Sequence, residues 1–195
     1  VARICQDGAV ANKERRTIGG GMIRSMLIVL VPIMALIWLL TDDLRDYPYE
    51  SVEWRPTLQT VRDAVDWPVQ APQGLPEGDN GWVPTRVSFI PVGDPVLDGS
   101  GSLRNHWRVG FLSPGEIYYE INQADDALQQ FVQDVTRDGR QVGEEPVGDQ
   151  MWERWESADG RTRTLVLREG PTVTMVTADV EFVDLQQFAH TLQAS

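Results

Sequence analysis

The sequence predicts an α+β protein, in which an N-terminal transmembrane helix is followed by one domain of mainly antiparallel sheet packed with two to three helices. Three observations lead to this prediction. An unbroken apolar run stands early in the chain, several later segments alternate apolar and polar residues as strands do, and others place apolar residues three and four apart, as on one face of a helix. The length of 195 residues and the hydrophobic content of 42% allow one packed core.

The first predicted element is a membrane-spanning helix. Residues 26–40 are all apolar, and extension to residues 22–41 gives a length of about 30 Å, which is the thickness of a bilayer core. Arg24 lies near enough to one end for its side chain to reach the headgroups. Two alternatives stay open, a buried helix of a soluble protein and a cleaved signal peptide, although no small residues follow the run at the spacing that cleavage requires.

The charges on either side of this run predict its orientation. Residues 1–41 carry five basic and two acidic side chains, whereas residues 42–195 carry 12 basic and 27 acidic ones, a net charge of −15. The positive-inside rule therefore places the protein in the cell membrane with its N-terminus in the cytoplasm. The predicted parts are a flexible cytoplasmic tail over residues 1–21, a transmembrane signal anchor over 22–41, a spacer over 42–50 and an extracytoplasmic α+β domain over 51–195.

The net negative charge of residues 42–195 also excludes one class of partner. A domain with this charge repels a phosphate backbone, and we expect no nucleic-acid partner.

The predicted outer domain starts with a helix and continues mainly as strands. The helix starts at Pro56 and places Leu58, Val61 and Val65 on one face. After a loop rich in Pro and Gly, alternation predicts six strands, over residues 83–89, 107–111, 117–121, 151–156, 163–168 and 172–177. Residues 124–135 and 182–192 return to helical spacing.

The order of these elements points to a duplicated ββα-type unit. Residues 107–135 and 164–192 each contain two strands and a helix, and both helices carry the tetrapeptide Leu-Gln-Gln-Phe. Such units place their helices on one face of an antiparallel sheet. The other face would then be partly wet, or covered by the helix that contains Leu58.

Short motifs with little chemical content are spread over most of the chain. They are Arg15-Arg16 ahead of the apolar run, VEWRP over residues 52–56, Trp67-Pro68-Val69 leading into GLPEG over residues 74–78, and Trp107–Phe111 followed by EIYYEINQ over residues 116–123. On these motifs the chain resembles a family of actinobacterial single-pass membrane proteins, domain of unknown function 4245. One departure is that Asp79-Asn80-Gly81 separate the Leu-Pro-Glu-Gly loop from Trp82. The resemblance implies a membrane-anchored outer domain, and it implies no established activity and no catalytic residues.

The sequence holds no motif for catalysis, metal binding or a cofactor. No Gly-x-Ser-x-Gly elbow follows a strand, and the only glycine run lacks the Lys-Ser/Thr of a phosphate-binding loop. A segment that starts at Asp94 has the length of a calcium loop, but Val96 stands where an oxygen ligand is needed and Asn105 where a bidentate Glu is needed. One cysteine and two histidines do not make a zinc framework. We therefore predict no catalytic residue, no metal ligand and no cofactor.

The polar face of the predicted sheet is the best candidate for a binding site. If the strands pair in sequence, one side carries Arg86, His106, Arg108, Tyr118 and Glu120, joined by Ser88, Asn122 and threonines of the second block (Thr162 or Thr164, and Thr172 or Thr174). Arg and Tyr are enriched at recognition surfaces. The alternative is an ordinary solvated face with cross-strand pairs of Arg and Glu.

The sequence thus predicts a membrane-anchored, extracytoplasmic domain that binds or scaffolds a protein, a glycan or another component of the cell envelope without catalysis. Two alternatives remain. One is an envelope hydrolase that acts through paired carboxylates, such as Glu116 with Glu120 or Glu153 with Glu156. The other is an accessory subunit whose anchor packs against another membrane protein.

Overall fold

A computed structural model of the protein describes residues 26–37, 50–78, 80–96, 99–125 and 129–194. The chain divides into two units, Val1–Pro48 and Tyr49–Ser195. In the first unit, residues 26–37 form a helix, and every one of them is exposed. None of the helices within the described ranges is both long enough and apolar enough to cross a bilayer. Outside the described residues lie the whole predicted tail, both ends of the predicted anchor, and residues 42–49 of the predicted spacer.

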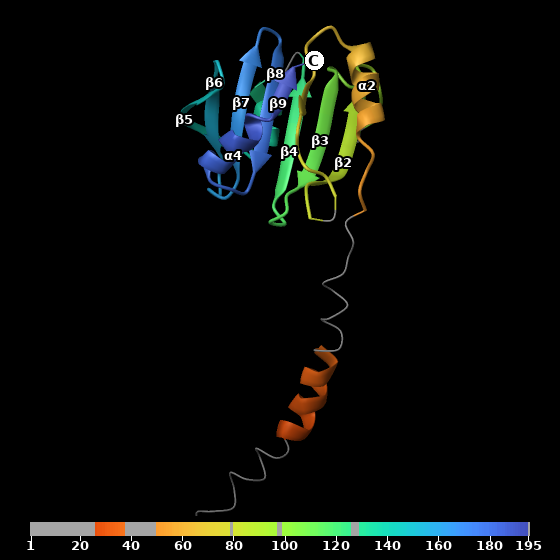
Figure 1. Ribbon diagram of the computed structural model, residues 1–195, viewed down its shortest axis with the longest axis vertical. Coiled ribbons are helices and arrows are strands. Elements are labelled where there is room, and N and C mark those ends of the chain that lie inside the picture. Colours follow the sequence, from red (N-terminus) through yellow and green to blue (C-terminus); the bar gives the residue numbers. More distant parts are fainter. Residues whose placement is uncertain (1–25, 38–49, 79, 97–98, 126–128, 195) are drawn as a thin grey trace, which may run out of the picture. The chain divides into compact units, whose positions relative to one another are not determined.

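The second unit is built on a seven-stranded sheet in which every neighbouring pair is antiparallel. Its strands are β2 (Val83–Ile90), β3 (His106–Leu112), β4 (Tyr118–Ala124), β5 (Arg140–Val147), β6 (Gln150–Glu156), β7 (Arg163–Glu169) and β8 (Thr172–Ala178). Their order is β2-β3-β4-β8-β7-β6-β5. The first half of the sheet (β2, β3 and β4) therefore meets the second half (β5 to β8) where β4 pairs with β8 (Figure 1). Three helices, α2 (Arg55–Ala64), α3 (Gln129–Val135) and α4 (Phe182–Ala189), and a small sheet of β1 (Gln70–Pro72) with β9 (Leu192–Ala194) accompany it. The predicted α+β architecture of this unit is confirmed.

One face of the sheet, which we call the apolar face, carries the main core. Alternate residues of β3, β4, β7 and β8 point to this face and are buried: Trp107, Val109, Phe111, Tyr119, Ile121, Leu165, Leu167 and Val176. Helices α2 and α4 cover it with Leu58, Val61, Leu185 and Phe188. Aromatic rings meet at its centre, where Trp54 lies edge-on to Phe111 at 5.5 Å and Phe188 lies 4.8 Å from Tyr119.

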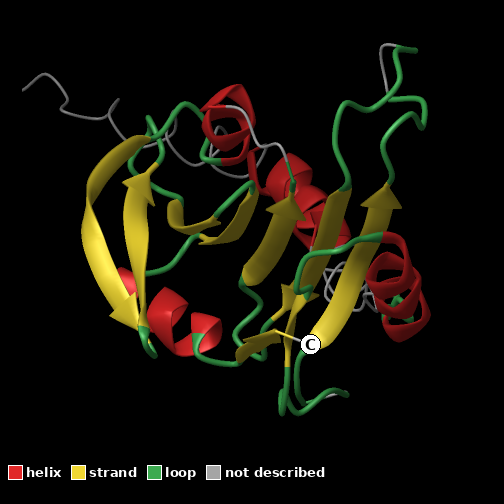
Figure 2. Ribbon diagram, turned by 90° about the horizontal axis from the view of Figure 1, so that it is seen from above, coloured by secondary structure: helices red, strands yellow, loops and turns green. Residues whose placement is uncertain are grey.

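The opposite face, which we call the polar face, is covered in part by α3. Val132 of α3 packs against Trp155, Val166, Val173 and Met175. Successive residues of β7 therefore point into different cores, and the sheet needs a cover on both sides. The helices that end the two predicted ββα units were expected on one face of the sheet. This expectation is wrong, because α3 and α4 lie on opposite faces. Seen from above, helices flank the strands on both sides (Figure 2). Each half does contain a hairpin followed by a helix, and the duplication itself stays a prediction.

Some element boundaries differ from the predicted ones. The sequence did not predict β5, because this edge strand is mostly exposed and therefore lacks the alternation of a half-buried strand. It also contains Gly143 and Pro146, two residues that are rare in strands. Ala124 ends β4 instead of starting the helix that follows, and Leu192 starts β9 instead of ending α4.

Candidate functional site

The polar face over β2, β3 and β4 carries all five residues of the predicted binding face. The register of the sheet places Arg86 opposite Gly110, and Gly110 opposite Glu120. In the next row, Arg108 lies opposite Asn122. Because residues two apart in a strand share a face, the same side of the sheet carries Arg86, His106, Arg108, Tyr118 and Glu120.

A chain of hydrogen bonds links the side chains of β3 and β4. Arg108 Nη2 lies 2.7 Å from Glu120 Oε2, and the Tyr118 hydroxyl donates to the same oxygen at 2.8 Å. Asn122 Nδ2 donates to Glu120 Oε1 at 2.8 Å, and His106 Nε2 lies 3.0 Å from Asn122 Oδ1. The amide nitrogen of Asn122 donates to Glu120, so the amide oxygen of Asn122 is the atom that faces His106. This oxygen can only accept a hydrogen bond, so the neutral ring of His106 carries its proton on Nε2.

These contacts hold Glu120 as a carboxylate. Burial by itself would raise the pKa of Glu120, but hydrogen bonds from Arg108, Asn122 and Tyr118 and the charge of Arg108 together lower this pKa below its usual value. Burial, followed by the charge of Glu120, raises the pKa of the Tyr118 hydroxyl. A carboxylate that accepts three hydrogen bonds and has a lowered pKa is a poor general acid near neutral pH.

His106 stands at the other end of the hydrogen-bond chain. Burial lowers the pKa of His106, and the charges of Arg108 and Arg104 lower it further, against the opposing effects of Asn122 and Glu120. The imidazole meets the Phe131 ring of α3 edge-on at 5.0 Å, and the Arg104 guanidinium lies 4.8 Å from the centre of the same ring. Phe131 therefore covers this end of the network, and His106 is neutral at pH 7.

Gly110 explains the position of the Tyr118 side chain. A Cβ atom on Gly110 would lie 2.0 Å from the Tyr118 hydroxyl oxygen and 2.5 Å from Cζ of the ring. The phenol thus occupies the space that any other residue at position 110 would fill, and this close approach is a reason for glycine in a strand. Tyr118 is still 39% exposed, so part of the ring faces solvent.

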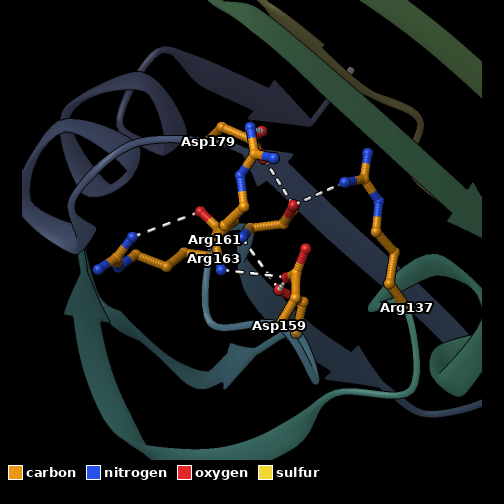
Figure 3. A network of polar contacts seen from close by, with 7 residues as sticks. Arg137, Asp159, Arg161, Arg163 and Asp179 are labelled. Atoms are coloured by element: carbon orange, nitrogen blue, oxygen red, sulfur yellow. Dashed lines mark hydrogen bonds and ion pairs between the residues drawn. The ribbon is translucent and has the colours of Figure 1, made fainter.

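Residues from the second half of the domain form another side of the site. Arg137 Nη1 donates to Thr162 Oγ1 at 2.9 Å, and the Thr162 hydroxyl donates to Asp179 Oδ1 (Figure 3). Arg161 Nη2 lies 4.0 Å from the other oxygen of Asp179. These contacts join the turn after α3 to the start of β7 and the end of β8.

Unusual backbone conformations gather at this site. Glu116, Arg137 and Asp138 have φ angles of 59°, 57° and 54°, in the left-handed region that non-glycine residues rarely adopt. Within the described ranges, no other residue except glycine has a positive φ. Such conformations concentrate at functional sites, where the surrounding structure holds them in place.

The two sides enclose a pocket of about 720 Å³, a volume typical of ligand sites. It is lined by Arg86, His106, Arg108, Glu116, Ile117, Tyr118, Glu120, Asn122, Phe131, Asp134, Val135, Arg137, Thr162, Thr177, Ala178 and Asp179. All five residues of the predicted binding face are among them. In the described parts of the chain, no group of three or more His, Cys, Asp and Glu side chains is arranged to hold a metal ion.

The structure adds residues that the sequence did not indicate and separates others that the sequence had paired. Phe131 and Arg137 come from α3 and the turn after it, and Asp179 follows β8, which reaches the site by pairing with β4; no local pattern signals that pairing. Glu153 and Glu156, considered as a catalytic pair, lie three apart on β6 and so point to opposite faces. Arg168 Nε donates to Glu153 at 3.0 Å.

The chain was then compared with known proteins. A family model described as "Protein of unknown function (DUF4245)" matches residues 15–192. The chain belongs to this family. The match includes every residue that lines the pocket, so the site is part of the DUF4245 region itself. No curated protein and no solved structure matches the chain.

Proposed function

We propose that this DUF4245 protein is a non-enzymatic binding protein of the cell envelope, held at the membrane by residues 22–41, whose ligand sits in the pocket on the polar face. The observation that carries the proposal is the convergence of polar side chains from three neighbouring strands and from the turn after α3 in one pocket of about 720 Å³. A concave site with a small number of fixed polar groups is the usual form of a ligand-binding site.

The state of the carboxylates supports binding without catalysis. Glu120 is engaged by Arg108, Tyr118 and Asn122 and has a lowered pKa, whereas a glycosidase needs one carboxyl group that stays protonated. The alternative pair of Glu153 and Glu156 lies on opposite faces of β6. Glu120 is therefore unsuited to be the protonated acid of a hydrolase, and Glu153 and Glu156 do not face one substrate together.

The membrane attachment rests on the apolar run and on the exposure of its described part. All side chains of the helix over residues 26–37 are exposed, and large apolar surfaces of this kind require lipid or a partner protein. The excess of basic residues before this helix and the acidic domain after it support an outward-facing domain. Protease added to intact cells should then degrade residues 51–195, and a protected domain would contradict this orientation.

Site-specific photo-crosslinking in intact cells tests the binding site. A photoreactive amino acid at Ile117, which lines the pocket and is 36% exposed, should capture an envelope component. The matched control is the same amino acid at Val183 of α4, which is 57% exposed and does not line the pocket. Equal capture at both positions, or capture at neither, would overturn the proposal.

The accessory-subunit alternative predicts a different crosslinking pattern. If the exposed helix binds another membrane protein, photoreactive groups at Leu30 and Leu36 should capture one protein of defined size, while Ile117 captures nothing. Capture at Ile117 alone would favour the binding protein.

A further inference from the structure

We infer that the pocket on the polar face binds a saccharide of low net charge, through hydrogen bonds to its hydroxyl groups and contact with its C–H faces. This inference rests on the proposed function and names the class of ligand. Four features of the pocket carry it: its balanced charge, its fixed donor–acceptor pairs, its exposed aromatic ring and its position in the sheet.

The charges of the pocket nearly cancel. Three arginines (Arg86, Arg108, Arg137) and four carboxylates (Glu116, Glu120, Asp134, Asp179) line it. A polyanion would therefore meet carboxylates and a polycation would meet guanidinium groups, and like charges at an interface suppress binding. A ligand with little net charge avoids both costs.

The polar groups are held as donors beside acceptors. Arg108 and Glu120 form a close pair at 2.7 Å and keep 29% and 12% of their side chains exposed. Arg137 is joined through Thr162 to Asp179, which again places a guanidinium near a carboxylate. A hydroxyl group both donates and accepts hydrogen bonds, so it can engage both members of such a pair at once.

Tyr118 supplies a rigid apolar surface among these groups. Its ring rests against the backbone at Gly110, and its hydroxyl is fixed on Glu120 at 2.8 Å. A ring that is already ordered loses little conformational entropy when a ligand binds. The electron-rich face of an aromatic ring attracts the positive edges of C–H groups, which line the faces of pyranose rings.

The position of the pocket in the sheet favours a saccharide over a peptide. Extended peptides gain affinity mainly from main-chain hydrogen bonds at a sheet edge. Most of the floor is formed by the interior strands β3, β4 and β8, whose main chains are paired on both sides, and the edge strand β2 adds Arg86. Over these interior strands, only side chains are left to bind a ligand, and side chains of this kind can recognise hydroxyl groups.

Calorimetric titration of the full chain tests the ligand class. A polyoxyethylene detergent is required, because detergents with sugar headgroups would compete. The probes are chitotetraose and maltotetraose as neutral saccharides, tetragalacturonate and tetraglucosamine as anionic and cationic ones, and tetra-alanine as the peptide. We expect at least one neutral saccharide to bind about tenfold or more tightly than each charged or peptide probe.

Variants connect this binding to the pocket. Tyr118→Ala should weaken the binding of the neutral saccharide at least about tenfold, whereas Tyr118→Phe, which keeps the ring, should stay within about threefold of the natural protein. Val183→Ala is the control on the opposite face and should change nothing. A thermal melt of each variant confirms that it is folded.

The possible failures separate the two proposals. If a charged probe or the peptide binds most tightly and Tyr118→Ala abolishes that binding, the saccharide inference is wrong and the binding function stands. Absence of binding by both neutral saccharides at about 10 mM overturns the inference as well. If envelope material crosslinks at Val183 but not at Ile117, the binding function fails, whichever saccharide or peptide probe binds in the titration.

Discussion

The apolar face and the polar face of the sheet are formed by the same strands, because successive residues of β3 and β4 point to opposite sides. On the apolar face, Phe111 is fully buried among aromatic rings and needs no polar partner. On the polar face, the intervening positions carry Arg108 and Glu120, which form an ion pair, and Glu120 also accepts hydrogen bonds from Tyr118 and Asn122. The larger core lies on the apolar face, and the part of the polar face that α3 does not cover carries the pocket.

Truncation of an aromatic residue on each face should separate these roles most strongly. Phe111→Ala leaves a cavity among Trp54 and Phe188, and we expect a loss of about 3–5 kcal/mol in the free energy of unfolding. Tyr118→Ala removes a partly exposed ring with one hydrogen bond, and the expected loss is about 1 kcal/mol. Urea unfolding of the full chain, followed by tryptophan fluorescence, measures both. Equal losses would show that the faces do not differ as described.

The second prediction concerns Gly110, where a single methyl group should disturb the polar face. Gly110→Ala places a Cβ where the Tyr118 hydroxyl lies, so the ring must move and its bond to Glu120 is lost. We expect a loss of about 1–2 kcal/mol in the free energy of unfolding.

A double-mutant cycle provides the control for this prediction. In the Tyr118→Ala background no ring stands in the way, and alanine is the better residue in a strand by about 0.5–1 kcal/mol. Gly110→Ala should then be neutral or stabilising, which gives a coupling energy above about 1 kcal/mol. An additive result would mean that Tyr118 does not rest on Gly110.

The contrast between the faces also explains how much the sequence could predict. Strands β2, β3, β4, β6, β7 and β8 were predicted from apolar and polar residues that alternate along the sequence. The grouping of Arg86, Arg108 and Glu120 followed from the same alternation, which places polar residues of neighbouring strands on one side. These are local properties of the chain.

Other parts of the fold depend on contacts between distant segments. Arg137 enters the pocket through a left-handed turn and a bond to Thr162, and neither has a signature in the sequence around it. Helices α3 and α4 belong to different cores on opposite faces of the sheet. Apolar periodicity shows that a helix has a buried side, but it does not show which face of the sheet receives that side.

The third prediction uses pH to act on the polar face alone. Because the folded state lowers the pKa of His106, the unfolded chain binds a proton first as the pH falls below about 6.5. The free energy of unfolding should therefore decrease as the pH falls below about 6.5, and the loss should end once the folded state also binds the proton. His106→Gln removes the titrating group and should flatten this part of the profile.

Glu120 should add a second loss at lower pH. Its folded-state pKa is lowered, so its stabilising contribution is complete above the ordinary glutamate pKa near 4.3 and is lost as the pH falls through the folded value. His190→Gln, at the exposed residue that caps the C-terminus of α4, is the control for the histidine effect. If His190→Gln flattens the profile as much as His106→Gln does, the decrease does not come from the polar face.

The smallest expected effect, and the sharpest test of strain, is at Arg137. A left-handed conformation costs a residue with a Cβ about 1 kcal/mol, and glycine avoids this cost. Arg137→Ala keeps the strain and loses the bond to Thr162, so it should be less stable than the natural protein by about 0.5–1 kcal/mol. Arg137→Gly loses the same bond and relieves the strain, so its free energy of unfolding should lie within about 0.5 kcal/mol of the natural value.

The matched control compares the free energies of unfolding of the alanine and glycine variants at Arg140. Arg140 is an exposed arginine at the start of β5, three residues further along the chain, and it has no positive φ. There glycine should be less stable than alanine by about 0.5–1 kcal/mol, the reverse of the order at Arg137. If both positions show the same order, the backbone at Arg137 is not strained. If the order reverses as expected, glycine would serve stability at position 137 as well as arginine does, and the arginine is then explained by what its guanidinium does in the pocket.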